Sequence, residues 1–282
     1  MSSLLLVESG STKTDWSLLQ SSGDLVQFRT SGINPYLQSA DTILELLKSE
    51  LSWDRSLIVD SIVFYGAGAG NLSQQNLISE VLRRFFEVRE IEVHGDMMAA
   101  ARAMCGQEKG IVCILGTGSN SCFYNGNTIQ EQQASLGYIA GDEGSGNYMG
   151  KRILQYYAYN TFDEELKMAF EMKFGNDISR IVTRLYAEPF PNRFLATFVE
   201  LLKENRGHYM VENIVEDCLN DFFHYHILKY RQSWKYPLYF TGSVAREFED
   251  ILQTLCDQYE LELGKIEKSP MQNLIAFHRR LL

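Results

Sequence analysis

The chain opens with short apolar runs that are separated by glycine, serine and threonine. The first three runs are Leu4–Glu8, Thr14–Gln20 and Leu25–Thr30. Between the first two lies Ser9-Gly10-Ser11-Thr12-Lys13, and the turn Ser21-Ser22-Gly23-Asp24 precedes the third. Apolar runs of this length with turn residues on both sides are typical of strands. We therefore predict that three strands, joined by tight turns, begin the fold.

Helical spacing then alternates with further strands. Apolar residues recur at three- and four-residue intervals, which places them on one face of a helix. They are Ile43, Leu44, Leu47 and Leu51 in one helix, and Ile78, Val81, Leu82, Phe85 and Phe86 in the next. Ser61–Tyr65 and Ile91–His94 are predicted strands. Met97–Cys105 is a predicted alanine-rich helix, which ends at Gly106.

A second set of strands follows. Its members are Ile111–Leu115, Ser121–Tyr124 and Thr128–Gln132, with turns at Gly116-Thr117-Gly118-Ser119-Asn120 and at Asn125-Gly126. Beyond Gly141-Asp142-Glu143-Gly144-Ser145-Gly146 the pattern is mostly helical to about Tyr230. The pattern then predicts a late strand, a helix and a final helical segment. These are Tyr236–Thr241, a helix from about Val244, and Met271–Leu282.

The same order of elements occurs twice. A strand, a turn rich in glycine and hydroxyl residues, a strand, a glycine turn and a third strand occupy residues 4–30 and again 111–132. Hairpins of this kind are common, so either unit alone has an ordinary explanation. The repetition in the same order favours an internal duplication. It predicts an α/β protein of two similar lobes with a cleft between them.

Composition narrows the class of protein. Hydrophobic residues make up 45% and charged residues 22%, which excludes a disordered chain. A net charge of −10 without a basic block argues against nucleic-acid partners. Apolar runs are too short for a membrane span or a signal peptide. Five cysteines without a CxxC pair argue against a disulfide framework and a common zinc site. We therefore expect a cytoplasmic location.

Two turns have the composition of phosphate-binding loops. Ser9–Asp15 combines a glycine with hydroxyl residues and Lys13, and Gly116–Asn120 has two glycines and two hydroxyls. Glycine lets backbone N–H groups approach an anion, and hydroxyls add hydrogen-bond donors. The first turn is not a Walker A loop, because a strand and not a helix follows it. The alternative interpretation is a pair of plain hairpin turns.

Asp96 follows a strand and opens a helix. One interpretation is a helix N-cap, which is a frequent position for aspartate. The other is a general base, because open α/β folds place ligands at the carboxyl ends of their strands. The two are compatible, since the positive end of a helix stabilises an ionised carboxylate.

Two further glycine-rich segments are candidates for ligand binding. Gly141–Gly146 holds two adjacent acids, Asp142 and Glu143, that suit sugar hydroxyls or hydrated Mg²⁺. A loop with an N-cap is the alternative. Gly66–Gly70 invites a dinucleotide-binding interpretation, but the motif requires glycine where the chain has Asn71. The five histidines lack metalloprotease spacing, and we interpret them as structural.

Taken together, these segments resemble a known family. Residues 6–16 resemble the first phosphate motif of the sugar kinase, actin and heat-shock chaperone ATPase superfamily, and residues 116–120 resemble the second. Residues 94–100 are similar to the segment with the catalytic aspartate, 141–145 to the substrate loop, and 240–244 to the adenosine motif. The nearest match is the N-acetylglucosamine kinase branch, which is grouped with the BadF/BadG/BcrA/BcrD ATPases.

The resemblance implies two ribonuclease H-like lobes of the actin-like ATPase type that bind ATP and a sugar. The lobes would comprise residues 1–108 with 271–282, and 109–270. It implies phosphorylation of an amino sugar, N-acetylglucosamine foremost, with Asp96 as the base for the 6-hydroxyl. The resemblance implies nucleotide contacts by Ser11, Thr12, Lys13, Thr117, Gly242 and Ser243. It implies sugar contacts by Asn34, Gly68, Asp96, Ser119, Asn120, Gly137 and Asp142.

The resemblance also implies Mg²⁺, held through water by the first residue of the first motif. That residue is usually aspartate, and here it is Glu8, which is one methylene longer. Because of this departure, a non-catalytic sugar sensor with the same fold remains an alternative function. A second alternative is an ATPase that drives a partner protein through a cysteine-bound iron–sulfur cluster. The resemblance is compatible with a homodimer. We expect no nucleic-acid partner and no membrane partner.

Overall fold

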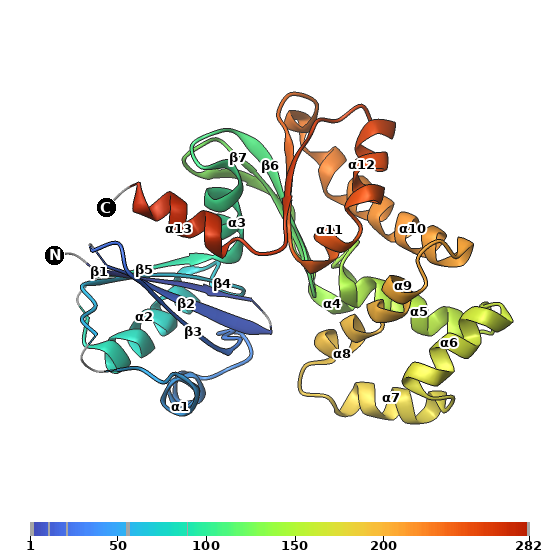
Figure 1. The fold of residues 1–282 in the computed structure, drawn as a ribbon, viewed down its shortest axis with the longest axis horizontal. Helices are drawn as coiled ribbons and strands as arrows, with labels where there is room; N and C mark the ends of the chain where they lie inside the picture. The colour runs from blue at the N-terminus through green and yellow to red at the C-terminus, as the bar shows by residue number, and fades with distance from the viewer. Residues whose placement is uncertain (1–2, 11, 21, 55–56, 89, 281–282) are drawn as a thin grey trace. The chain divides into compact units, whose positions relative to one another are not determined.

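A computed structural model describes residues 3–10, 12–20, 22–54, 57–88 and 90–280. The chain divides into two compact units (Figure 1). Unit 1 comprises Met1–Gly106 and Pro270–Leu282, and unit 2 comprises Gln107–Ser269. Each unit is built around its own five-stranded sheet. No helix in the described part of the chain has the length and apolar character needed to cross a membrane.

The sheet of unit 1 has the order β3-β2-β1-β4-β5. Its strands are β1 (Ser3–Ser9), β2 (Lys13–Gln20), β3 (Leu25–Ser31), β4 (Ser61–Gly66) and β5 (Glu90–Gly95). β2 runs antiparallel to both β1 and β3, whereas β1, β4 and β5 are parallel. The predicted strands are all present and extend by up to one residue at their ends.

Helices cover both faces of this sheet (Figure 1). α1 (Ala40–Glu50) and α2 (Leu72–Phe86) lie on one face, and α3 (Asp96–Cys105) and α13 (Met271–Arg279) on the other. β1 is buried on both sides, because Leu5 and Val7 pack into the core under α1 and α2 while Leu4 and Leu6 are buried as well. A strand that is covered on both faces has a continuous apolar sequence, as the run Leu4–Val7 does.

The sheet of unit 2 repeats the arrangement. Its order is β8-β7-β6-β9-β10, formed by β6 (Gly110–Leu115), β7 (Ser119–Tyr124), β8 (Ile129–Gln132), β9 (Leu238–Thr241) and β10 (Leu263–Glu267). β7 again runs antiparallel to its two neighbours, and β6, β9 and β10 are parallel. Identical order and strand direction confirm the predicted fold class of two ribonuclease H-like lobes. β10 was not predicted, because an edge strand with Gly264 and Lys265 has little apolar pattern.

Helices make up most of the rest of unit 2. They are α4 (Gly137–Ala140), α5 (Gly146–Ala158), α6 (Glu164–Phe174), α7 (Ile178–Ala187), α8 (Pro191–Thr197), α9 (Val199–Glu204), α10 (Tyr209–Tyr225), α11 (Ser243–Glu247) and α12 (Glu249–Gln258), with short 3₁₀ turns at Ile227–Lys229 and Arg231–Trp234. One continuous apolar core joins β6 to α5, α10 and α12. α10 is buried along a stripe of apolar residues, which includes Val211, Ile214, Val215, Cys218 and Phe222.

Within unit 1, a buried polar cluster joins the last helix, α13, to β4 and α3. Tyr65 on β4 shares a hydrogen bond of 2.8 Å with Nε2 of His278 on α13, and its hydroxyl accepts one of 2.6 Å from Nη1 of Arg102 on α3. The rings of Tyr65 and His94 are stacked. Burial, and secondarily the Arg102 charge, lowers the pKa of His278 to about 4. His278 is therefore neutral in the folded protein at neutral pH.

This cluster predicts a loss of stability in acid. Because the folded pKa of His278 lies below the usual 6.5, unfolding takes up a proton between pH 6.5 and 4, and stability falls as pH falls through that window. The contribution of His278 should drop by about 2 kcal/mol between pH 7.5 and pH 5. Urea unfolding of the wild type and of His278→Gln at both pH values measures it. An equal pH dependence in the two proteins would contradict the assignment.

Candidate active site

The carboxyl ends of the parallel strands gather the candidate residues of unit 1 at one edge of its sheet. Glu8, Tyr65 and His94 lie in register across β1, β4 and β5, and one step further Ser9, Gly66 and Gly95 do the same. The loops that leave these strands therefore start side by side. They are residues 10–12 after β1, the segment with Gly68 after β4, and Asp96 after β5. β3 runs in the same direction, so the segment with Asn34 starts there too.

The first phosphate-type loop is a braced hairpin. The Gly10 N–H donates to the Lys13 carbonyl at 3.0 Å. Behind the turn, the Ser9 hydroxyl lies 2.8 Å from the Thr14 hydroxyl, donates to the Ile33 carbonyl at 3.0 Å and accepts from the Ile33 N–H at 2.9 Å. Ser9 thus ties the hairpin to the segment that leads to Asn34. Thr12 is exposed, and Ser11 lies outside the described residues.

Lys13 is engaged by a carboxylate. Its ammonium pairs with Oδ2 of Asp15, whose Oδ1 accepts from Nε of Arg29 at 2.7 Å. The Asp15 side chain is largely buried, and that of Lys13 is 44% exposed. Lys13 stands beside the hairpin, as a phosphate contact requires, but a phosphate would have to share its ammonium with Asp15.

The carboxylates of Asp15 and Asp96 act on that of Glu8 in unit 1. The pKa of Glu8 is raised to about 7, first by burial and then by the charges of Asp15 and Asp96, while Lys13 opposes the shift. Such a site favours a bound cation, because a cation would offset the charge that burial and the neighbouring acids penalise. In the described part of the chain no three acidic, histidine or cysteine side chains converge on one point. Mg²⁺ is usually held by one or two carboxylates with waters and substrate phosphates, and Glu8 offers one such carboxylate.

Asp96 is the first residue of α3 and not its N-cap. Gly95 occupies the cap position, and Oδ1 of Asp96 accepts from the N–H of Met97 at 2.9 Å. The N-cap interpretation is therefore wrong by one residue, because the strand continues through Gly95. Burial raises the pKa of Asp96, opposed by hydrogen bonds from backbone N–H groups. A carboxyl whose pKa is raised toward neutrality is a better proton acceptor than an ordinary aspartate.

Asn34 and Gly68 meet in unit 1. Gly68 has φ +81°, and a Cβ atom there would lie 2.5 Å from Oδ1 of Asn34. The same oxygen accepts from the Tyr36 N–H at 3.0 Å, which fixes the carboxamide. Only glycine satisfies both the backbone angle and the close approach. The structure thus brings together two of the residues that the sequence assigns to the sugar.

The second phosphate-type loop and the adenosine-type segment are neighbours in unit 2. The Gly116 N–H donates to the Gly118 carbonyl at 3.0 Å, and the Gly146 N–H donates to the Gly116 carbonyl at 2.8 Å. A Cβ atom at Gly242, where φ is +125°, would lie 2.1 Å from the Leu115 carbonyl oxygen. β9 therefore delivers Gly242 directly against the start of the loop, and the exposed Ser243 begins α11 beside it.

Asp142 is held against the same loop. Its Oδ2 accepts from Nδ2 of Asn147 at 2.7 Å, and its Oδ1 from the Ser119 N–H at 3.4 Å. Asn147 also donates from Nδ2 to the Thr117 carbonyl at 2.6 Å. Burial raises the pKa of Asp142, and these hydrogen bonds oppose the shift. Nothing in the sequence distinguishes Asn147 from an ordinary residue in the first turn of a helix, so this role could not be predicted.

Asn120 and Gly137, the remaining predicted sugar residues of unit 2, lie next in sequence to Ser119 and one turn before Gly141, respectively. Oδ1 of Asn120 accepts from the Ser121 N–H at 2.9 Å and from Nε2 of Gln132 at 3.3 Å, so its amide group is oriented. Gly137 is the first residue of α4, and its carbonyl accepts a hydrogen bond of 2.8 Å from the Gly141 N–H.

Three buried oxygen atoms near this loop are unsatisfied. Among the described residues, Oγ of Ser119, Oδ1 of Asn147 and Oγ1 of Thr241 are buried without a hydrogen-bond partner. All three lie at or next to the segments assigned to phosphate, sugar and adenosine. Unsatisfied buried polar atoms are rare in native proteins, so they favour a ligand at this place.

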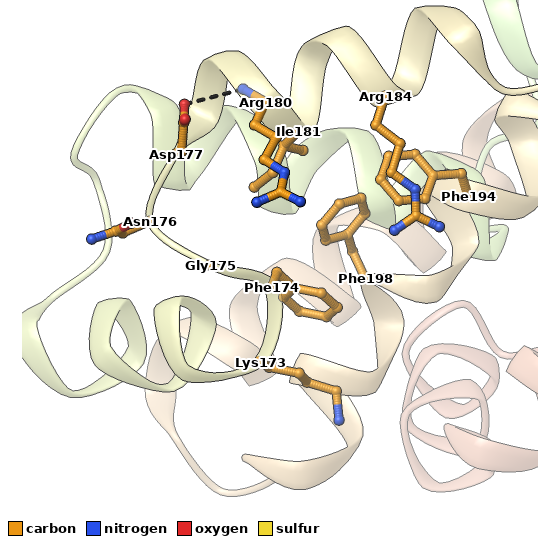
Figure 2. A pocket seen from close by; sticks show the side chains of 10 residues that line it. All are labelled: Lys173, Phe174, Gly175, Asn176, Asp177, Arg180, Ile181, Arg184, Phe194 and Phe198. Atoms are coloured by element: carbon orange, nitrogen blue, oxygen red, sulfur yellow. Dashed lines mark hydrogen bonds between the residues drawn. The ribbon is translucent and has the colours of Figure 1, made fainter.

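A separate pocket of about 240 Å³ lies among α6, α7 and α8 (Figure 2). Its wall is formed by Phe174, Phe194 and Phe198, and the cationic side chains of Lys173, Arg180 and Arg184 also line it. Two of those cations already have partners, Lys173 with Glu204 and Arg184 with Glu188. None of the predicted site residues lines this pocket, so we do not assign the reaction to it. All five cysteines are buried, which gives no support to a cluster shared with a partner.

Known structures share this fold. A crystal structure of a "putative N-acetylglucosamine kinase" from Porphyromonas gingivalis is 37% identical, covers 98% of this chain and 99% of its own, and has a TM-score of 0.92. Another protein described in the same words, from Chromobacterium violaceum, is 17% identical over 98% and 99%, with a TM-score of 0.76. A glucokinase from Streptomyces griseus with glucose and AMPPNP is 14% identical over 94% and 93%, with a TM-score of 0.53.

No protein with a curated description matches the chain. The model of the BadF/BadG/BcrA/BcrD ATPase family, however, matches residues 7–272. That range contains both phosphate-type loops, Asp96, the Asp142 segment and Gly242. The chain therefore belongs to the BadF/BadG/BcrA/BcrD ATPase family.

Proposed function

We propose that the protein is an ATP-dependent kinase that phosphorylates an amino sugar at its 6-hydroxyl, with N-acetylglucosamine as the foremost substrate. The observation that carries the proposal is the placement of Asp96. Its carboxyl stands at the carboxyl edge of the first sheet, has a raised pKa, and belongs to the same acidic cluster as Glu8. The name of the 37% identical protein from Porphyromonas gingivalis supports the same substrate class.

The proposed roles divide between the two units. In unit 1, Asp96 accepts the proton of the sugar hydroxyl, the hairpin with Thr12 and Lys13 binds phosphate, and Asn34 with Gly68 contacts the sugar. In unit 2, Thr117 binds phosphate, and Gly242 and Ser243 lie against the adenosine. The residues of unit 2 that contact the sugar are Ser119, Asn120, Gly137 and Asp142. Phosphoryl transfer depends mainly on positioning and charge neutralisation, which this division supplies.

Glu8 would hold Mg²⁺ through water, next to Asp15. When bound, Mg²⁺ supplies charge neutralisation at the phosphate oxygens. The protein's own part is to keep Glu8 in place, and the Lys13 charge favours its ionised form. Glu8 also motivates the second candidate, a sugar sensor without kinase activity, because its longer side chain changes the reach of the carboxylate. A coupled ADP-release assay across N-acetylglucosamine, glucosamine and N-acetylmuramic acid separates the two, since a sensor binds a sugar without releasing ADP.

Removal of the Asp96 charge should abolish most turnover. Asp96→Asn keeps the shape of the side chain but cannot accept a proton, so kcat should fall by about 10²- to 10⁴-fold. ATP-analogue affinity, measured by calorimetry, should change less than about twofold, because the base acts on the sugar. Glu90→Gln, at the exposed start of the preceding strand, is the matched control. Turnover like that of the wild type in Asp96→Asn would refute the assignment.

Loss of the Asp142 carboxylate should weaken the binding of the sugar and leave the binding of the nucleotide nearly unchanged. In Asp142→Ala a sugar hydroxyl loses a charged acceptor, and such hydrogen bonds contribute about 1.5–3 kcal/mol. N-acetylglucosamine affinity should therefore fall at least about tenfold, with nucleotide affinity nearly unchanged. Calorimetric titration with each ligand gives both values. Unchanged sugar affinity together with lost nucleotide binding would move Asp142 to the metal.

Magnesium binding should release protons near pH 7. The pKa of Glu8 is about 7 without a cation, so part of the population is protonated at that pH, and Mg²⁺ favours the ionised form. With ADP present, Mg²⁺ should release about half a proton at pH 7 and bind more tightly as pH rises from 6 to 8. Calorimetry in two buffers of different ionisation enthalpy counts the protons. Glu8→Gln should lose this release, and release equal to that of the wild type would place the metal elsewhere.

A further inference from the structure

A buried chain of hydrogen bonds runs behind the proposed sugar-contacting residues of unit 2. Nε2 of His226 lies 3.2 Å from Oε2 of Glu143, and its Nδ1 lies 3.2 Å from Oγ of Ser121. The Ser121 hydroxyl lies 2.9 Å from the Tyr230 hydroxyl, which accepts from the Gln133 N–H at 2.9 Å. His226 is 5% exposed and Ser121 is fully buried, so the middle of this hydrogen-bond chain is closed to solvent.

The protons in this chain have a single consistent direction. A carboxylate can only accept, so Nε2 of His226 carries the proton toward Glu143, and Nδ1 must accept from Ser121. The Ser121 oxygen then accepts from Tyr230, and the Tyr230 oxygen accepts from Gln133. Burial lowers the pKa of His226, which keeps its ring neutral as this arrangement requires.

Two members of this hydrogen-bond chain are sequence neighbours of residues assigned to the sugar. Glu143 follows Asp142, Ser121 follows Asn120, and Gln133 follows the Gln132 side chain that donates to Asn120. Neighbouring residues on a strand point to opposite faces, so buried Ser121 anchors β7 while Asn120 is presented on the other side. The chain therefore fixes the two sugar-contacting residues from behind.

The packing around His226 leaves the substrate loop little freedom. Its ring stacks on Phe222 of α10 with ring centres 4.6 Å apart. A Cβ atom at Gly144 would lie 2.8 Å from Cβ of Phe222, so the loop after Glu143 rests directly on the same helix. His226 ends α10, and it joins that helix to the loop on one side and to β7 on the other.

We propose that His226 is a positioning residue for the sugar, and that its imidazole sets the separation between Asn120 on β7 and Asp142 on the substrate loop. This inference rests on the proposed function for its ligand. It assigns His226 no contact with the sugar or with ATP. Its loss should thus alter sugar binding through the spacing of two groups and leave nucleotide binding intact.

His226→Phe tests the inference, because it keeps the stacked ring and removes both nitrogens. The KM for N-acetylglucosamine should rise about tenfold, the scale of one lost charged hydrogen bond, while the KM for ATP stays within about twofold. Tyr230→Phe, which removes only the far link, should raise the sugar KM by a smaller factor and serves if His226→Phe fails to fold. His224→Phe, exposed on the same helix, is the matched control.

Amide hydrogen exchange gives a readout that does not need kinase activity. In His226→Phe, exchange should accelerate at residues 119–121 and 141–145 and stay unchanged in the rest of unit 2. Unchanged exchange and sugar KM, or a rise in both KM values with faster exchange throughout unit 2, would overturn the positioning role. If the wild type phosphorylates no amino sugar, the proposed function fails, and the exchange pattern still decides whether His226 holds the two segments.

Discussion

The parallel pairing of β1 with β4, and of β4 with β5, is the constraint on which the site in unit 1 depends. It sets Ser9, Gly66 and Gly95 in register, so that the next residues of three distant segments emerge at one edge. A slip of one residue would turn Glu8 into the core and Val7 out of it, because side chains alternate across a strand. The apolar burial of Leu5 and Val7 under α1 and α2 opposes such a slip. Burial of the core thereby fixes the positions of the charged groups.

The cost of this arrangement is electrostatic. Glu8 and Asp96 are acids whose burial raises their pKa values, and the charge of Asp96 raises the pKa of Glu8 further. Asp15 is compensated by Lys13 and Arg29, and it is therefore the structural acid of the three. Asp142 in unit 2 shows the same combination of burial and opposing hydrogen bonds. Perturbed carboxylates at strand ends and in glycine-rich loops are what a site for cationic and hydroxyl-bearing ligands requires.

The sequence predicted what local pattern and internal repetition can reveal. The strands of both meanders and the duplicated order follow from apolar runs and turn residues, and the two sheets share one topology. β10 could not be predicted, because an edge strand needs little apolar sequence. Asp96 is the first helical residue and not the predicted N-cap, because β5 extends one residue beyond its apolar run. Asn147 and His226 could not be found, since their roles arise only when segments distant in sequence meet. His226 lies 83 residues from Glu143 and 105 from Ser121.

We propose that the carboxylates of the two units serve phosphoryl transfer to a sugar. Phosphorus NMR of a reaction with Mg²⁺, ATP and N-acetylglucosamine is the decisive test, because it reports both the fate of the γ-phosphoryl group and the carbon that bears it. We expect a new phosphomonoester signal coupled to the protons on carbon 6, with ADP in equal amount. ADP with inorganic phosphate alone, or unchanged ATP in the presence of bound sugar, would contradict it.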